Sequence, residues 1–316
     1  MGEFLNKKDA AKYLDISMTK FNKLVEQGKI APVVDDDRTF RFDTDELAKH
    51  MKKSNKTPVI VIANQKGGIL KSTTALSLAV NKAKEGKKVA LIDMDPQGNL
   101  SEQLCDDDTI EGHSIVRALL GLRNIASCVV ELSPALSFIP TDIDLNHILF
   151  HLSSRGDISK YILSDIIHEV RHKYDVIIID TPPNNPFIVS MCLAAASQVI
   201  VPCHMSTWAG KGVVRVIDTV KDQLKDKRGK SEIKSVIILP TSVNRKRRIL
   251  FKDKEFNEYL DSLKVKFSDN VVSVAKTVIP NIETAPDIET MDAQTVMTAS
   301  HPVFEHYKKF ITETGI

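Results

Sequence analysis

The chain has 316 residues, of which 42% are hydrophobic and 27% are charged, and its net charge is +2. This composition is typical of a soluble globular protein, and the near-neutral charge excludes a globally basic nucleic-acid-binding chain, so any DNA contact must come from local patches. The four cysteines lack C-x-x-C spacing, which argues against a zinc site and predicts reduced cytosolic thiols; no apolar run predicts a signal region or a membrane span.

The first 53 residues predict a separate small domain. Gly28 is placed to end a helix, and Ser17 is a suitable N-cap for that helix. The expected elements are helices over Lys7–Leu14, Met18–Gln27 and Asp43–Met51, and a β-hairpin that joins Ile30–Val34 to Thr39–Phe42. Two short helices joined by a tight turn form a helix-turn-helix. Residues 54–58 are polar, end in proline and predict a linker to a large domain over residues 59–316.

The segments KKDAAKYLDIS, EQGKI, RTFRF and DTDEL of this small domain resemble the winged helix-turn-helix of the MerR and excisionase families. The resemblance implies that Met18–Lys23 forms a DNA-recognition helix and that a wing contacts the DNA backbone. The DNA-binding residues it implies are Thr19, Lys20, Lys23, Arg38 and Arg41. The alternative is a small protein-interaction domain, which the phosphate-repelling run Asp35–Asp37 favours.

Residues Val59–Thr74, with the sequence VIVIANQKGGILKSTT, predict a phosphate-binding loop. The apolar, β-branched run Val59–Ala63 suits a buried strand, and Lys71–Thr74 open a helix that continues over Ala75–Lys84. Between strand and helix lies a turn with two adjacent glycines, so successive backbone N–H groups and the helix dipole favour an anion there. The alternative is that this segment is an ordinary strand–turn–helix without a phosphate site.

The order Lys66-Gly67-Gly68-x-x-Lys71-Ser72-Thr73 resembles the deviant Walker A box of the ParA/MinD family of ATPases. The resemblance implies that Lys71 holds the β- and γ-phosphates, that Ser72 binds Mg²⁺ and that Lys66 reaches a partner's nucleotide across a dimer interface. The implied cofactor-binding residues of the loop are Gly67, Gly68, Ile69, Leu70, Lys71, Ser72 and Thr73. Leu70 departs from the pattern, because the family has glycine there and leucine is strained if φ is positive.

Two further strands end in aspartates. Asp93 lies at the end of the strand expected over Val89–Met94 and Asp95 directly follows that strand, both within DMDPQGN, and Asp180 ends the apolar run of DVIIIDTPP. Carboxylates at the carboxyl ends of parallel strands lie beside the ligand of an open α/β sheet. The first segment resembles switch I of the ParA family and the second resembles its Walker B strand. These resemblances imply that Asp95 positions the attacking water and that Asp93 and Asp180 support the Mg²⁺ site.

The rest of the chain alternates between expected helices and strands. Helices are expected over Ser114–Leu122, Ile143–Leu152, Ile158–Lys173, Ser190–Ala196, Val213–Leu224, Phe256–Leu263 and Pro302–Ile311, and strands over Leu136–Ile139, Gln198–Pro202, Ser235–Pro240 and Val274–Ile279. By the family resemblance, the cationic cluster Arg245, Lys246, Arg247 and Arg248 binds DNA without sequence preference, whereas a solvated charge run is the alternative. The segment IPNIETAPD resembles the family's nucleotide-side loop, which adds Pro280 and Asn281 to the expected cofactor-binding residues.

The alternation predicts an α/β fold with a doubly wound, mostly parallel sheet, preceded by the small winged helix-turn-helix domain. The resemblance implies a DNA-partition ATPase of the cytoplasm and nucleoid, with ATP/ADP and Mg²⁺ as cofactors. Its implied partners are a second copy of the chain, nonspecific and operator DNA, and a ParB-type centromere-binding protein, with no membrane. The alternatives are a nucleotide-sensing repressor whose hydrolysis Leu70 impairs, and a MinD-like positioning ATPase, against which the missing amphipathic tail counts. A nitrogenase-type iron protein would need cluster cysteines that the chain does not place.

Overall fold

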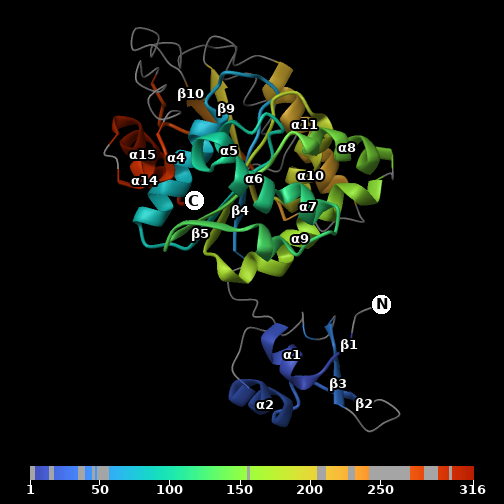
Figure 1. Ribbon diagram of the computed structural model, residues 1–316. Coiled ribbons are helices and arrows are strands. Elements are labelled where there is room, and N and C mark those ends of the chain that lie inside the picture. Colours follow the sequence, from blue (N-terminus) through green and yellow to red (C-terminus); the bar gives the residue numbers. More distant parts are fainter. Residues whose placement is uncertain are drawn as a thin grey trace. The chain divides into compact units, whose positions relative to one another are not determined.

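The computed structural model describes residues 4–13, 18–34, 40–44, 47, 57–154, 157–204, 211–226, 232–241, 271–280, 291–298 and 301–316. The chain divides into two compact units, residues 1–56 and residues 57–316, each of which is described by itself (Figure 1). No helix within the described ranges is both long and apolar enough to cross a bilayer.

The N-terminal unit holds two helices and a small antiparallel sheet. Its elements are β1 (Phe4–Leu5), α1 (Lys7–Tyr13), α2 (Met18–Glu26), β2 (Val33–Val34) and β3 (Phe40–Asp43), with β3 central in the order β1-β3-β2. Phe21 and Phe42 meet edge to face with ring centroids 5.0 Å apart, which fixes α2 against β3. Gly28 ends α2 at φ +65°, as expected, while Ser17 and most of the expected third helix lie outside the described residues.

The large unit is built on an eight-stranded sheet with the order β11-β10-β9-β4-β8-β5-β7-β6. The strands are β4 (Val59–Ile62), β5 (Val89–Asp93), β6 (Val130–Ser133), β7 (Leu136–Ile139), β8 (Val176–Asp180), β9 (Gln198–His204), β10 (Ser235–Thr241) and β11 (Val272–Val274). Every pair is parallel except β6 with β7, which confirms the predicted mostly parallel sheet. The edge strand β6 was not predicted.

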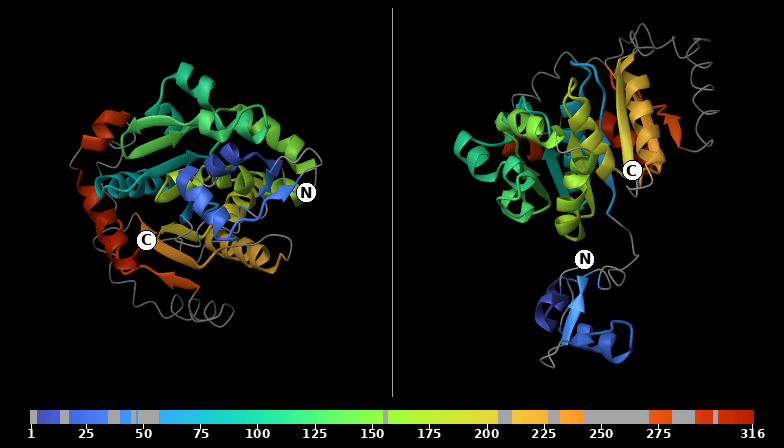
Figure 2. Two further views of the ribbon diagram at one scale, coloured as in Figure 1. Left: turned by 90° about the horizontal axis from the view of Figure 1, so that it is seen from below. Right: turned by 90° about the vertical axis from the view of Figure 1, so that its right-hand side faces the viewer.

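Helices cover both faces of this sheet, because its central strands are apolar on both sides (Figure 2). Val59 and Val61 of β4 join one core cluster with α7 to α11, whereas Ile60 and Ile62 join the other cluster with α4 and α15. The helices are α4 (Lys71–Lys84), α5 (Asn99–Leu104), α6 (Asp107–His113), α7 (Ile115–Leu119), α8 (Asp144–Ser154), α9 (Ile162–Val170), α10 (Pro186–Ala195), α11 (Lys211–Lys225), α14 (Ala293–Thr298) and α15 (Pro302–Thr314).

Several predicted boundaries were wrong; the helix predicted over Ser190–Ala196, for example, begins earlier, at Pro186 of α10. The helix predicted over Ser114–Leu122 ends early, because Gly121 takes φ +71°. The helix predicted over Ile158–Lys173 is divided into a 3₁₀ turn, α9 and a second 3₁₀ turn, and its first turn is held by Lys160 and Tyr161 bonding to Asp226. The latter two shifts come from local geometry and tertiary contacts that apolar spacing does not encode.

The strand predicted over Val274–Ile279 lies earlier in the chain, at β11. Beyond β11, the N–H groups of Lys276 and Thr277 donate to the carboxylate of Glu313 at 2.6 and 2.7 Å. They therefore pair with the end of α15 in place of a neighbouring strand. The helix predicted over Phe256–Leu263 lies outside the described residues.

All four cysteines are free. Burial raises the pKa of Cys105 to about 11 and that of Cys203 to about 12, so both thiols stay protonated near neutral pH.

Candidate nucleotide-binding site

The loop between β4 and α4 makes a left-handed turn directly before the helix. Gly68 has φ +66°, and Leu70 has φ 64° and ψ 36°, so Leu70 occupies the left-handed region that glycine would fill without strain. Helix α4 begins at Lys71 without a side-chain cap from Leu70. The first N–H groups of the helix therefore face the loop, which is the arrangement that binds an anion.

Lys71 lies inside this loop. Only 7% of it is exposed, and its ammonium donates to the carbonyl oxygen of Lys66 at 3.1 Å. Burial lowers the pKa of Lys71, and the carboxylates of Asp180 and Asp95 oppose that fall. Because burial disfavours a charged ammonium, an anion bound in the loop would stabilise the charged form of Lys71.

Asp180 and Asp93 are paired neighbours at the carboxyl ends of β8 and β5, and both are buried. Burial, followed by the charge of Asp93, raises the pKa of Asp180 to about 8, while Ser72 and Lys71 nearby oppose the rise. One Asp180 oxygen accepts from the N–H of Thr181 at 3.0 Å, and Oδ2 is buried without a hydrogen-bond partner among the described residues. An unsatisfied carboxylate oxygen beside a serine hydroxyl fits a hard divalent cation.

Asp93 shapes the neighbouring loop. Its Oδ1 accepts from the N–H of Asp95 at 2.9 Å, and its Oδ2 accepts from the N–H and the hydroxyl of Ser101 at 3.1 and 2.8 Å. The Ser101 hydroxyl accepts in turn from the N–H of Thr141 at 2.9 Å. Burial raises the pKa of Asp93 to about 7. Because both oxygens are bonded, the structure favours Asp93 as the residue that positions the loop carrying Asp95.

Asp95 follows β5 and is 8% exposed. Its Oδ1 accepts from the N–H of Gln97 at 3.0 Å, which closes a turn and leaves the carboxylate near the Lys71 ammonium. No group of three or more His, Cys, Asp or Glu side chains within the described ranges could hold a metal by itself. A cation at Asp180 would therefore complete its coordination with Ser72, phosphate oxygens and water, as Mg²⁺ commonly does.

The remaining predicted loop residues lie around this centre. Gly67 and Gly68 are exposed, Ile69 and Thr73 are buried, and Lys66 is exposed at the mouth of the loop. The hydroxyl of Thr241, at the end of β10, donates to the Ile69 carbonyl at 3.2 Å. Neither Thr241 nor Ser101 could be found from local sequence patterns, since their contacts with Ile69 and Thr141 join segments distant in the chain.

The segment that follows β11 also contacts β10, because the N–H of Ile279 donates to the Pro240 carbonyl at 2.8 Å. Pro280 is half-buried there, while Asn281 and the cluster Arg245–Arg248 lie outside the described residues.

In the N-terminal unit, the predicted DNA-binding residues fall on two elements. Thr19 and Lys23 are exposed on α2, and Arg41 is exposed on β3. The position of Lys20 is on α2, but its side chain lies outside the described set, as does the whole of Arg38.

Comparisons with known proteins agree with this geometry. The family described as an AAA domain matches residues 57–234. The chain is similar to the chromosome-partitioning ATPase Soj of Treponema pallidum, with 37% identity over 164 residues, which are 51% of this chain and 63% of that protein. It is similar to the chromosome partitioning protein ParA of Caulobacter vibrioides, with 32% identity over 188 residues, 58% of this chain and 70% of that protein.

A solved structure shows the same fold. Cobyrinic acid a,c-diamide synthase from Mycobacterium smegmatis, with bound ADP and magnesium, matches with a TM-score of 0.60 and 26% identity over 80% of this chain and 96% of that chain. Because that structure holds ADP and magnesium, the loop before α4 and the buried carboxyl groups beside it are the candidate nucleotide and cation site of this chain.

Proposed function

The chain belongs to the ParA/Soj family of partition ATPases with an AAA domain, and from this premise we propose that it is a Mg-ATP-dependent DNA-partition ATPase. The observation that carries the proposal is Lys71, which is buried in the loop with its ammonium on the Lys66 carbonyl and with Asp180 and Asp95 close enough to influence its pKa. A structural lysine would gain more by reaching solvent, whereas a phosphate-binding lysine needs this position.

Each residue of the site has a role in phosphoryl transfer. The backbone N–H groups before and within the first turn of α4 surround the phosphates, and Lys71 balances their charge. Asp180 and Ser72 hold the cation, which supplies charge neutralisation when it is bound. Asp95, held by the loop that Asp93 organises, orients the attacking water. Lys66, at the mouth of the loop, contacts the nucleotide of a second copy of the chain when two copies close face to face.

The partners of this ATPase are a second copy of the chain, DNA and a ParB-type protein. The ATP-bound dimer binds DNA without sequence preference, and a ParB-type protein stimulates its hydrolysis. The N-terminal unit is a winged helix-turn-helix that binds an operator, which the exposed Thr19, Lys23 and Arg41 support. Nonspecific binding uses the Arg245–Arg248 cluster, a role supported by its run of positive charge alone. The protein acts in the cytoplasm on the nucleoid.

The test is Mg-ATP binding and hydrolysis by the full chain, with and without random-sequence DNA. Lys71→Ala should remove both activities, whereas the matched control Lys82→Ala should retain them. Lys82 lies on the same helix but pairs with Glu85 at 3.0 Å at the far end. Loss of activity in Lys71→Ala alone supports the proposal, and equal activity in both variants contradicts it.

A second candidate function rests on Leu70. Its left-handed conformation is strained, and a strained loop that binds nucleotide without turning it over would make the chain a nucleotide-sensing repressor. Hydrolysis that stays absent even with a ParB-type partner and DNA favours this candidate. In that case substitution of Thr19 and Lys23 should remove all DNA binding, whereas the partition ATPase would keep its nonspecific binding.

A further inference from the structure

Helix α15 packs along α4 and places the buried hydroxyl of Tyr307 next to the first turn of α4. Tyr307 and Thr74 are both fully buried, and the Tyr307 hydroxyl lies 2.7 Å from Thr74 Oγ1. Thr74 Oγ1 in turn donates to the carbonyl oxygen of Leu70 at 2.5 Å. We call this chain of contacts, Tyr307 to Thr74 to Leu70, the hydroxyl relay.

The donor count fixes the direction of the relay. A threonine hydroxyl has one hydrogen, and Thr74 uses it on the Leu70 carbonyl, which can only accept. Tyr307 must therefore be the donor to Thr74. Burial raises the pKa of Tyr307, which keeps the phenol protonated and able to donate.

The relay ends on the one strained residue of the phosphate loop. Among the described residues, Leu70 is the only one other than glycine with positive φ. Its carbonyl also accepts the N–H of Thr74 at 2.9 Å, so two donors hold the same oxygen. In a planar trans peptide the C=O and the following N–H point in opposite directions. Holding the Leu70 oxygen towards Thr74 therefore turns the N–H of Lys71 the other way, towards the loop.

Resting on the proposed nucleotide site, we propose that Tyr307 is a positioning residue of the phosphate loop, which holds Leu70 left-handed through Thr74. Glycine needs no such support, because its αL conformation is unstrained. Leucine at this position needs a compensating contact, and the C-terminal helix supplies it. Nucleotide affinity then depends on a residue more than 200 positions from the loop, and α15 becomes part of the binding site's framework.

A simple role in core packing does not explain the hydroxyl. The other buried α15 side chains in this cluster, Val303, Phe304, Phe310 and Ile311, are apolar, and a phenylalanine at 307 would fill the same space. Another polar contact between the helices is made by Asn81, whose amide donates to the Phe304 carbonyl at 3.2 Å and does not reach the loop.

The experiment measures Mg-ADP affinity of the full chain by calorimetry. Tyr307→Phe removes the hydroxyl and keeps the ring, and should weaken Mg-ADP about fivefold, the effect of one lost hydrogen bond. Leu70→Gly added to it should return the affinity to within about twofold of the wild-type value, because relief of strain replaces the relay. A purely structural tyrosine would show no such rescue. Thr74→Val breaks the relay from its other end and should match Tyr307→Phe, which keeps the test available if either variant folds poorly.

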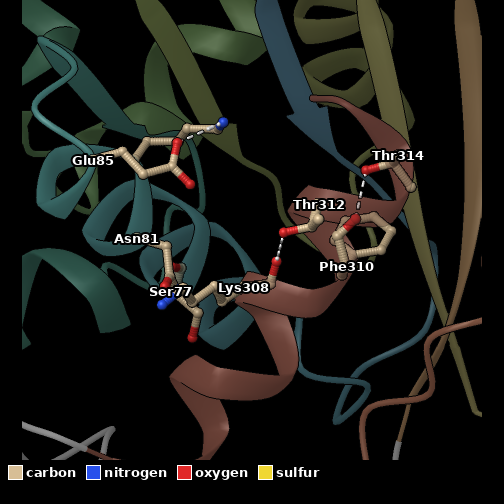
Figure 3. A network of polar contacts seen from close by, with 8 residues as sticks. Ser77, Asn81, Glu85, Lys308, Phe310, Thr312 and Thr314 are labelled. Atoms are coloured by element: carbon tan, nitrogen blue, oxygen red, sulfur yellow. Dashed lines mark hydrogen bonds and ion pairs between the residues drawn. The ribbon is translucent and has the colours of Figure 1, made fainter.

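Thr314→Val is the matched control. Thr314 also lies on α15, but its hydroxyl bonds within the helix to the Phe310 carbonyl at 2.7 Å, as Figure 3 shows beside α4. This control should leave the affinity unchanged. An unchanged affinity in Tyr307→Phe, or an equal loss with and without Leu70→Gly, overturns the proposal.

Amide exchange separates this proposal from the proposed function. In the nucleotide-free chain, Tyr307→Phe should speed exchange of the Thr74 N–H, which donates to Leu70, while Thr314→Val should not. If the wild-type chain binds no Mg-ADP, the proposed function fails, and this exchange still decides the relay. Unchanged Thr74 exchange in Tyr307→Phe contradicts it.

Discussion

Asp180→Asn should make the nucleotide-free protein more stable while removing its cation site. Asp180 is 1% exposed, and its pKa of about 8 stands well above the ordinary 3.8. Between these two values the folded chain keeps a proton that the unfolded chain releases. The folded state thus binds more protons than the unfolded state, so the free energy of unfolding falls as pH rises through this window.

The magnitude follows from that difference. Each pH unit is worth about 1.4 kcal/mol, so at pH 7, roughly three units above 3.8, retention of the proton by Asp180 costs the fold about 4 kcal/mol. Asparagine has no charge to suppress, but its buried amide lacks partners and costs about 1–3 kcal/mol. The net gain expected for Asp180→Asn at pH 7 is therefore about 1–3 kcal/mol, and at pH 5 it should vanish or reverse.

Thermal and urea unfolding in the presence of a chelator measure this gain at pH 5, 7 and 8. The expected rise in melting temperature at pH 7 is about 2–10 °C for a domain of this size. The reasoning is refuted if Asp180→Asn melts below the wild type at pH 8, or if the difference between them does not grow with pH. The same variant should lose the Mg²⁺ dependence of nucleotide binding, measured by calorimetry with and without the metal.

Three further outcomes are expected. Lys71→Ala should lower Mg-ATP affinity at least about 100-fold in calorimetry, since it removes a charge-assisted contact of about 3 kcal/mol or more; an effect under about threefold would show that Lys71 does not face the phosphates. Gly212→Ala should destabilise by about 1–2 kcal/mol in urea unfolding, because its Cβ would lie 2.4 Å from the buried Asn64 Oδ1; unchanged stability would mean that Asn64 moves freely. Ser101→Ala should slow single-turnover hydrolysis about tenfold with little change in Mg-ADP affinity, since it loosens Asp93 and the loop that carries Asp95 but leaves the loop before α4 intact; a matching loss of affinity would contradict this division.

The parallel sheet was predictable because its central strands are short β-branched runs bounded by turn residues. Such runs are buried on both faces only in a covered parallel sheet, and the alternation with helical spacing fixed the fold class. The edge of the sheet was harder to predict. β6 is half-exposed and pairs antiparallel across a short turn, so it lacks the continuous apolar run that marked β4 and β8.

The site was predictable as far as residue types at strand ends could indicate it. Lys71, Asp93, Asp95 and Asp180 were all expected at one edge of the sheet, and the structure brings them together. The sequence did not show that both oxygens of Asp93 are engaged by Asp95 and Ser101. The role of Asp93 in positioning its loop depends on the directions of the Asp95 and Ser101 N–H groups, which are set only when the loop is folded.

The sequence by itself determined the central parallel strands, the turn between β4 and α4 and the unusual leucine at position 70, because these depend on local periodicity and on which residues tolerate positive φ. Only the tertiary structure decided how that leucine is accommodated. Thr74 lies one helical turn away, but Tyr307 comes from the far end of the chain, and their hydroxyls meet only because α15 packs on α4. Contacts between distant segments leave no spacing in the sequence, since the chain between them is free to vary in length.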